Sequence, residues 1–161
     1  MFSKIKYIWF DIDGVLTDGS LYISDNGIES KKFNVRDGQL IKYMKSKGLR
    51  FGCFSSRKSD ATLRRMQELS IDIIELGVEN KLKSVEFYLN KYGTQFENIC
   101  YIGDDIVDLE VIEKVGVAVC PQDACLLVKQ RAHIITRAKG GQGVLRELIE
   151  FIISFDQDLK L

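Results

Sequence analysis

The sequence predicts an α/β protein in which helices flank a parallel sheet. Two observations lead to this fold class. Short apolar runs rich in β-branched and aromatic residues alternate with segments of helical periodicity, the pattern of parallel strands joined by crossover helices. The chain has 161 residues, the length of one domain, and no linker-like or repeated segment divides it. We therefore expect one α/β domain over residues 1–161.

Six strands are expected, with helices in the intervals between them. The strands are placed at residues 7–10, 50–54, 71–75, 99–102, 117–120 and 133–135. A helix over 37–47 opens on Asp37, an acid that can cap it, and stops at Gly48. A helix over 81–92 ends at Gly93, another begins near Ser59 as its N-cap, and a C-terminal helix and tail occupy about 144–161.

One stretch breaks the alternation of strands and helices. Two extended segments, 21–23 and 31–33, lie on either side of Asp25-Asn26-Gly27. Asn-Gly between extended segments is a strong hairpin signal. We expect a β-hairpin flap over about residues 20–34, soon after the first strand.

Composition excludes several classes of function. Lys+Arg and Asp+Glu both number 23, so no excess of positive charge favours nucleic acid. The apolar runs fall short of the ~20 residues of a membrane helix, and no signal-like leader precedes the first strand. The four cysteines form no C-x-x-C pair, which argues against a zinc site or a disulfide framework and favours a reducing compartment. We expect a cytoplasmic protein that binds neither nucleic acid nor membrane.

Two aspartates, Asp11 and Asp13, follow the first expected strand in the sequence WFDIDGVLTD. Ligands of open parallel sheets bind outside the carboxyl ends of the strands. Period two directs both carboxylates to one face, where they repel each other unless a cation or a shared proton intervenes. Magnesium, which takes oxygen ligands, would resolve the conflict. Taken alone, the pair could equally be a solvated end of the strand; Asp18 is expected only to shape the loop into the flap.

A second group of acids follows the fourth expected strand, in the sequence YIGDDIVD. Asp104 would complete the magnesium site. Asp105 and Asp108 would not bind the ion but would hold its ligands or the water molecules bound to it. Asp108 could instead simply cap the next helix. Acids at two strand ends can thus meet over one ion.

Residues suited to a phosphate follow the second and third strands. Ser55 and Arg57 precede a helix, and a hydroxyl, a guanidinium and helix N-terminal amides all suit this anion. Lys81 lies at the mouth of the expected sheet, where its charge could neutralise phosphate, although an isolated lysine is usually a surface residue.

Four separated motifs resemble the haloacid dehalogenase superfamily of aspartate-nucleophile phosphatases. They are DIDGVLTDG from Asp11, Ser55 after a strand, Lys81 before a helix, and GDDIVD from Gly103. KKFNVRDG after the hairpin and GGQGVLRE over 140–147 are similar to the small capless branch that includes 3-deoxy-D-manno-octulosonate 8-phosphate phosphatases. The resemblance covers nearly the whole chain and implies a single Rossmann-like domain without a separate cap.

The resemblance also implies a mechanism. Asp11 would attack phosphorus and form an aspartyl-phosphate, and Asp13 would protonate the departing sugar oxygen and then activate water. Magnesium would be held by the Asp11 and Asp104 side chains and the Asp13 backbone carbonyl. Ser55 and Lys81 would bind the phosphoryl group.

For the substrate, the resemblance implies an acidic sugar phosphate. Arg57 and Arg65, eight residues apart and expected on one helical face, could reach its carboxylate. The segment matching Asn34, Val35, Arg36, Asp37 and Gly38 would line the site, and a neighbour in a homotetramer would help to close the pocket.

The chain departs from the family pattern in places, and alternatives stay open. Ser56 stands where glycine is usual, and the segment after Gly38 lacks a second glycine. Residues 120–125, CPQDAC, are similar to a phosphatase-like module attached to sialic acid cytidylyltransferases. A nonulosonate 9-phosphate phosphatase is therefore one alternative, although Arg57 and NVRDG favour the octulosonate. A non-catalytic oligomerisation or regulatory module is another, and a calcium-binding protein is the weakest, because no twelve-residue ligand loop is present.

Overall fold

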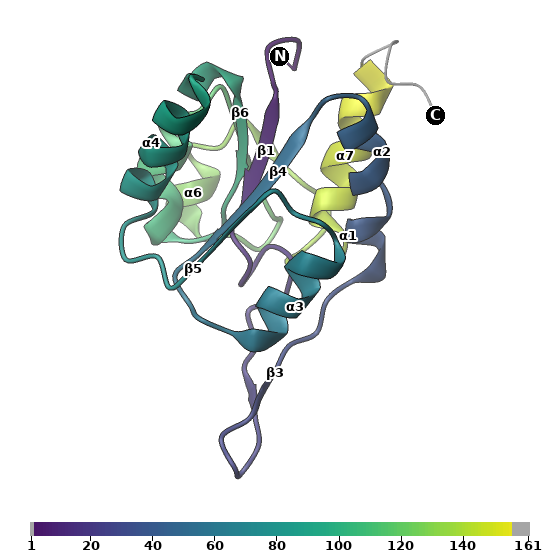
Figure 1. Ribbon diagram of the computed structural model, residues 1–161, viewed down its shortest axis with the longest axis vertical. Helices are drawn as coiled ribbons and strands as arrows, with labels where there is room; N and C mark the ends of the chain where they lie inside the picture. The colour runs from purple at the N-terminus through teal and green to yellow at the C-terminus, as the bar shows by residue number, and fades with distance from the viewer. Residues whose placement is uncertain (1, 156–161) are drawn as a thin grey trace.

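A six-stranded parallel sheet forms the centre of the molecule in the computed structural model, which describes residues 2–155 (Figure 1). Its strand order is β5-β4-β1-β6-β7-β8. The strands are β1 (Tyr7–Phe10), β4 (Arg50–Ser55), β5 (Ile73–Leu76), β6 (Ile99–Ile102), β7 (Val117–Cys120) and β8 (Ile134–Ile135). Because β1 lies between β4 and β6, the carboxyl ends of these three strands adjoin. The α/β prediction is confirmed.

Helices cover both faces of the sheet (Figure 1). On one face lie α1 (Val35–Gln39), α2 (Ile41–Ser46), α3 (Asp60–Glu68) and α7 (Val144–Phe155). On the other lie α4 (Lys81–Tyr92), α5 (Leu109–Ile112) and α6 (Leu126–Lys129), and two short 3₁₀ helices, η1 (Phe96–Asn98) and η2 (Ile106–Asp108), precede β6 and α5.

Strand β1 shows how the core is divided. Ile8 and Phe10 pack into the cluster under α2, α3 and α7, whereas Trp9 packs into the cluster under α4 and α5. All three side chains are fully buried. A strand covered on both faces reads as a continuous apolar run, which is why the sequence identified β1 directly.

The flap is a two-stranded antiparallel hairpin of β2 (Tyr22–Ile23) and β3 (Glu29–Ser30), which projects from the body of the molecule (Figure 1). Gly27, at φ +79°, occupies the turn. The prediction of a hairpin is confirmed, but its second strand comes earlier than the expected 31–33. The residues after β3 instead turn back toward the sheet.

Strands β4 and β8 differ from expectation by one residue, and two other elements differ by more, for local reasons. The helix expected over 37–47 is two helices, α1 and α2, which meet at Leu40 (φ −96°, ψ −5°), and its N-cap is Asn34 rather than Asp37. Strand β5 begins two residues late, because the Ile71 amide closes the end of α3 by donating to the Met66 carbonyl. The helix over 81–92, its end at Gly93 and the Ser59 cap of α3 are confirmed.

Within residues 2–155, no helix is both long and apolar enough to cross a membrane. Helix α7 begins at Val144 as expected, and the tail expected beyond Phe155 lies outside the described residues.

Candidate active site

The loops that follow β1, β4 and β6 enclose a cavity of ≈ 280 Å³. Six residues predicted from the sequence as site residues line this cavity: Asp11, Asp13, Ser55, Arg57, Asp104 and Asp105. The rest of the lining comes from Gly14, Gly19, Ser56 and Val107. The three segments are far apart in the sequence and meet because their strands are neighbours in the sheet.

A buried lysine connects two of the acids. Lys81, the first residue of α4, has its Nζ 2.7 Å from an oxygen of Asp11 and 2.7 Å from an oxygen of Asp108. Lys81 is 3% exposed and Asp108 fully buried. Asp108 also accepts hydrogen bonds from the Tyr101 hydroxyl (2.8 Å) and the Asp104 amide (3.1 Å). Asp108 therefore orients its neighbours, and its side chain does not cap α5.

Burial makes the negative charges of this site costly. It raises the pKa of Asp11 to about 7, although Lys81 opposes the change. Burial, with the nearby charges of Asp11 and Asp108, raises the pKa of Asp104 to about 8. Burial alone would lower the pKa of Lys81, but the two carboxylates raise it above its usual value. One lysine thus does not balance the acids, and the site favours an additional cation.

The arrangement of oxygens fits a hard divalent cation. Asp11, Asp104 and Asp108 each offer an oxygen, and these atoms lie within 4.8 Å of one another. Because Asp108 already accepts from several donors, Asp11 and Asp104 are the better ligands. Oδ1 of Asp104 is buried and has no hydrogen-bond partner in the described part of the chain. A buried carboxylate oxygen left unpaired beside a second carboxylate suits magnesium.

Glycine is required at position 14 to bring Asp104 this close. Gly14 has φ +84°, and a Cβ there would overlap the Asp104 carboxylate. Asp105 is exposed at the cavity and accepts from the Ile106 amide at 2.8 Å, as the N-cap of η2. Asp18 accepts from the Ser20 amide at 2.9 Å in the loop that leads to the flap.

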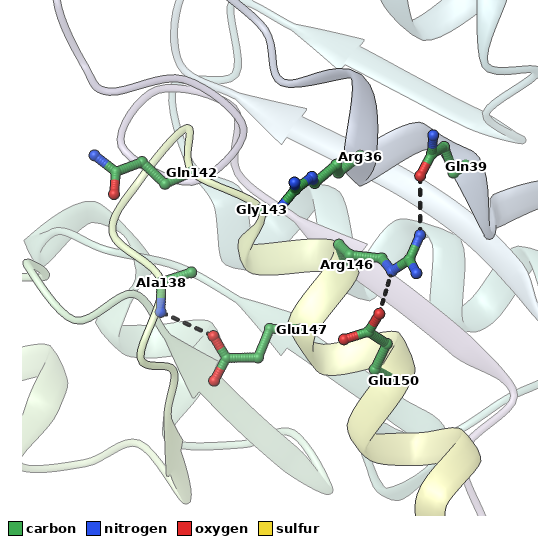
Figure 2. A pocket seen from close by; sticks show the side chains of 8 residues that line it. All are labelled: Arg36, Gln39, Ala138, Gln142, Gly143, Arg146, Glu147 and Glu150. Atoms are coloured by element: carbon green, nitrogen blue, oxygen red, sulfur yellow. Dashed lines mark hydrogen bonds and ion pairs between the residues drawn. The ribbon is translucent and has the colours of Figure 1, made fainter.

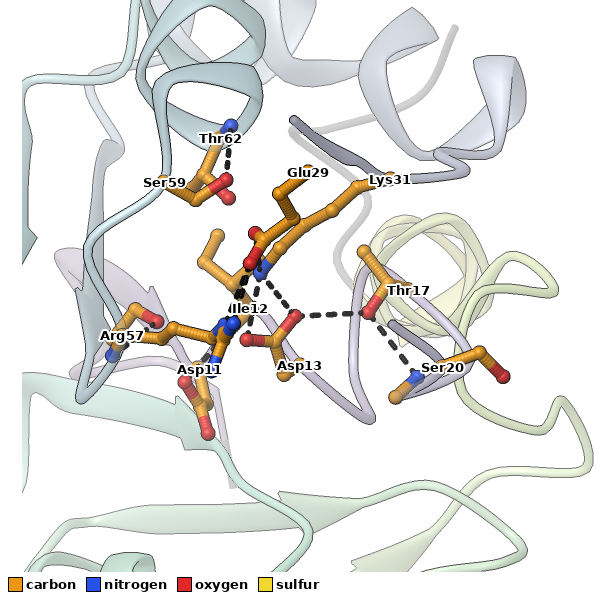
Figure 3. A network of polar contacts seen from close by, with 12 residues as sticks. Asp11, Ile12, Asp13, Thr17, Ser20, Glu29, Lys31, Arg57, Ser59 and Thr62 are labelled. Carbon is orange, nitrogen blue, oxygen red and sulfur yellow. Dashed lines mark hydrogen bonds and ion pairs between the residues drawn. The ribbon is translucent and has the colours of Figure 1, made fainter. Parts of the chain in front are cut away.

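Asp13 has a partner that the sequence reasoning missed. Lys31 donates to both Asp13 oxygens, at 2.6 and 2.7 Å, and the Thr17 hydroxyl donates to one of them at 3.2 Å (Figure 3). Two separate lysines, Lys81 and Lys31, therefore accompany Asp11 and Asp13. In the sequence, Glu29 and Lys31 stand two residues apart in a hairpin that follows the aspartates, and this spacing alone does not distinguish them from other flap residues.

Ser55 and Arg57, which the sequence predicts as anion-binding residues, also line the cavity. Ser55, the last residue of β4, is 1% exposed, and its hydroxyl accepts from the Arg57 amide at 3.3 Å. The Arg57 side chain binds Glu29 of the flap, with Nη2 and Nε at 2.5 and 2.9 Å from one oxygen (Figure 3). Arg57 precedes α3, so the expectation that it shares a helical face with Arg65 is wrong.

The GGQG segment packs directly against the loop that carries the aspartates. A Cβ on Gly140 would overlap the Gly14 carbonyl oxygen, and Gly141, at φ +70°, donates its amide to the Val15 carbonyl at 3.0 Å. The Gly140 amide in turn donates to Asp123 at 2.9 Å. This segment therefore holds the loop of the aspartates in position.

The segment 34–38 does not line the Asp11 cavity of its own chain. Arg36 lines a second cavity of ≈ 460 Å³, with Gln39, Arg146 and Glu150 (Figure 2). Asn34 caps α1, Val35 is exposed, and Arg65 pairs with Glu68 at 2.9 Å and lies beside Gly38. The structure thus brings Arg65 to this segment rather than to Asp11.

Contrary to the expectation from the sequence, Asp37 does not cap its own helix but contacts the start of α7. It is 3% exposed, and its carboxylate accepts from the Arg146 amide in the first turn of α7 at 3.1 Å. Burial raises the pKa of Asp37 to about 6. The carboxylate fixes α1 to the start of α7, which follows the GGQG segment.

Comparison with known proteins agrees with this geometry. The model of the haloacid dehalogenase-like hydrolase family matches residues 54–148. The 3-deoxy-D-manno-octulosonate 8-phosphate phosphatase of Escherichia coli K12 is 38% identical over 151 residues, which cover 94% of this chain and 80% of the relative. The Salmonella typhi enzyme of the same name is 37% identical over the same coverage.

Solved structures of similar proteins superpose closely. The Yersinia pestis 3-deoxy-D-manno-octulosonate 8-phosphate phosphatase has a TM-score of 0.94 and 34% identity, over 98% of this chain and 85% of that one. The Moraxella catarrhalis enzyme, solved with magnesium, phosphate and the KDO sugar, has a TM-score of 0.93 and 31% identity, over 97% and 90%. The chain belongs to the haloacid dehalogenase-like hydrolase family, and within it to the relatives of the 3-deoxy-D-manno-octulosonate 8-phosphate phosphatases.

Proposed function

We propose that the protein is a magnesium-dependent phosphatase that hydrolyses 3-deoxy-D-manno-octulosonate 8-phosphate through an aspartyl-phosphate. The observation that carries this proposal is the buried Asp11, paired with Lys81 and facing Asp104 across a cavity at the strand ends. The relatives named for this reaction support the substrate. Residues 1–161 would act as one phosphatase domain without a cap.

The proposed reaction has two halves. A carboxylate oxygen of Asp11 attacks phosphorus in line, the bond from phosphorus to the sugar oxygen breaks, and Asp13 gives that oxygen a proton. Asp13 then takes a proton from a water molecule, which attacks phosphorus and frees Asp11. Both carboxyls line the same cavity, in reach of one bound phosphate.

The other residues stabilise charge and alignment. Lys81 and the Ser55 hydroxyl would bind the phosphoryl oxygens, and Asp108 keeps Lys81 in place. Magnesium would be held by the Asp11 and Asp104 side chains and the Asp13 carbonyl, and when bound it supplies positive charge to the transferring phosphoryl group. Asp105, at the rim of the cavity, would hold the ligands of the ion or the water molecules bound to it.

The substrate is tested by comparing acidic sugars. Phosphate release should be measured with octulosonate 8-phosphate, a nonulosonate 9-phosphate and glucose 6-phosphate, each with magnesium and with EDTA. We expect the highest kcat/KM with octulosonate 8-phosphate, for which the relatives are named, and no release in EDTA, which removes magnesium. Since Arg57 can pair with a sugar carboxylate, both acidic sugars should be hydrolysed faster than glucose 6-phosphate. A preference for the nonulosonate would change the substrate and keep the reaction; no release from any of the three would refute the function.

We further propose a homotetramer in which a neighbour helps to close the pocket. The flap exposes Leu21, Tyr22, Ile23 and Ile28, and an exposed apolar group of this kind favours an interface. Arg36 and Arg65, which lie away from their own Asp11, could then serve a neighbour's substrate. Light scattering should show four chains for the wild type and a smaller particle for Ile23→Asp; a monomeric wild type would contradict this part.

The proposed compartment is the cytoplasm. Cys53, Cys100, Cys120 and Cys125 are all free thiols, which fits a reducing environment. Fractionation of the cells that produce the protein tests this assignment, and recovery of the protein with secreted proteins would contradict it.

A further inference from the structure

Strand β3 and the chain just after it present two charged side chains to the active site. Glu29 and Lys31 are two residues apart, so in extended chain they point to the same side. Lys31 contacts both oxygens of Asp13, and Glu29 contacts the guanidinium of Arg57 (Figure 3). The flap therefore touches the carboxyl proposed as proton donor and the arginine proposed for the sugar carboxylate.

Burial distinguishes Lys31 from an ordinary flap lysine. Its side chain has no exposed surface, whereas that of Asp13 is 26% exposed. Nζ of Lys31 also lies 3.8 Å from Glu29, whose side chain is 18% exposed. An ammonium group withdrawn from water is costly unless it is paired, and these two carboxylates pair it. The lysine is thus held at one place, with Asp13 on one side and Glu29 on the other.

We propose that Lys31 is a positioning residue, which fixes the Asp13 carboxylate at the cavity and thereby makes docking of the flap a condition of turnover. The inference rests on the proposed function, because it takes Asp13 as the group that moves the proton. Asp13 stands in a loop beyond β1, and the donors to its side chain within residues 2–155 are themselves side chains. Hydrogen bonds from Lys31 and Thr17 orient this carboxylate.

Glu29 positions Arg57 in the way that Lys31 positions Asp13. The side chain of Arg57 is 43% exposed, and a free arginine at that exposure has many rotamers. Pairing with Glu29 selects one of them beside the cavity. Since both contacts come from one strand end, undocking of the flap releases Asp13 and Arg57 together.

The experiment compares Lys31→Ala and Lys31→Arg with Lys32→Ala in the full-length chain. Lys32 is the neighbouring lysine of the same flap and is exposed, so it controls for loss of charge and for general effects on the hairpin. We expect Lys31→Ala to lower kcat about 100-fold with KM for octulosonate 8-phosphate little changed, since misplacing a reacting group by about 1 Å has an effect of this order. Lys32→Ala should match the wild type, and Lys31→Arg should recover part of the loss.

Two further readouts separate positioning from simple stability. Methylammonium should restore part of the activity of Lys31→Ala, whereas tetramethylammonium, which has no N–H, should not. Hydrogen exchange of the amides at 22–30 should be faster in Lys31→Ala than in Lys32→Ala, because the docking contact is lost.

A Lys31→Ala enzyme with a kcat within about threefold of the wild type would overturn the proposal. So would a loss that neither arginine nor methylammonium relieves, because the lysine would then serve only stability. A wild-type chain that hydrolyses none of the sugar phosphates would instead refute the proposed function. In that case hydrogen exchange still decides whether Lys31 docks the flap. Equal exchange rates in Lys31→Ala and Lys32→Ala would show that Lys31 does not dock the flap.

Discussion

Replacing Lys81 by methionine tests how the buried charges of the site are balanced. The change removes the ammonium that lies 2.7 Å from both Asp11 and Asp108 and leaves two buried carboxylates without it. Breaking a buried ion pair from one side costs about 3–5 kcal/mol, which for a chain of this length lowers Tm by roughly 6–20 °C. Lys83→Met is the matched control, because Lys83 is exposed on the same helix.

The pH dependence of this loss has a definite sign. Burial raises the pKa of Asp11 to about 7 even while Lys81 opposes it, so without Lys81 the pKa is higher still. The folded variant then keeps a proton that the unfolded chain releases near the ordinary aspartate pKa of 3.8, and its stability falls as pH rises from about 4 through the folded pKa. The deficit of Lys81→Met against the wild type should therefore be largest at pH 8 and smaller at pH 5.

Thermal unfolding followed by circular dichroism, in EDTA from pH 5 to pH 8, measures the effect. Added magnesium should return part of the lost stability, because it supplies positive charge beside Asp11. A Lys81→Met variant that is no less stable than Lys83→Met, or whose deficit is the same at pH 5 and pH 8, would contradict this balance of buried charges.

Three other predictions concern Asp104, Asp37 and the GGQG segment. Because the pKa of Asp104 is raised to about 8, the wild type in EDTA loses stability as pH rises toward 8. At pH 8 the Tm of Asp104→Asn should therefore be higher than that of the wild type, and magnesium should not raise it further. Calorimetry and thermal unfolding measure both effects. The pKa of Asp37, raised from 3.8 to about 6, predicts that Asp37→Asn gains up to roughly 3 kcal/mol on the wild type between pH 4 and pH 7; urea unfolding at both values measures it, and a constant difference would contradict it. Gly141→Ala should lower kcat as well as stability, whereas Gly93→Ala, at a similar φ of +60° but with open space around it, should lower stability alone; equal kcat in the two variants would refute the link to the aspartate loop.

Much of the site could be predicted because its residues stand at strand ends. Asp11 follows β1, Ser55 is the last residue of β4, and Asp104 comes soon after β6. The rule that ligands bind outside the carboxyl ends of parallel strands places them together without knowledge of side-chain positions. The order of the strands makes β4 and β6 the neighbours of β1, which the sequence does not state.

The contacts of the flap could not be predicted in the same way. The Asn-Gly turn located the hairpin, but the direction in which a two-stranded hairpin returns depends on packing against the rest of the molecule. Nothing in the sequence separates Lys31 from the adjacent Lys32, although only the Lys32 side chain is exposed. Nothing in the sequence marks Glu29 as its partner either.

Asp37 shows a different limit. An acid at the expected start of a helix is commonly its cap, yet this one lies inside α1 and binds the amide of Arg146, 109 positions away. Local pattern placed the start of the helix two residues too late, and only the tertiary contact explains why a buried carboxylate is tolerated there. Arg57 and Arg65 were likewise paired by spacing, whereas the structure separates them by starting α3 at Asp60.

Direct detection of the covalent intermediate tests the central claim that Asp11 is the nucleophile. The enzyme would be mixed with octulosonate 8-phosphate and magnesium, quenched within one turnover, reduced with borohydride and digested for mass spectrometry. Our account predicts homoserine at position 11, formed by reduction of the aspartyl-phosphate, and neither homoserine nor phosphate release in Asp11→Asn. Reduction at another aspartate, or phosphate release by Asp11→Asn at the wild-type rate, would contradict it.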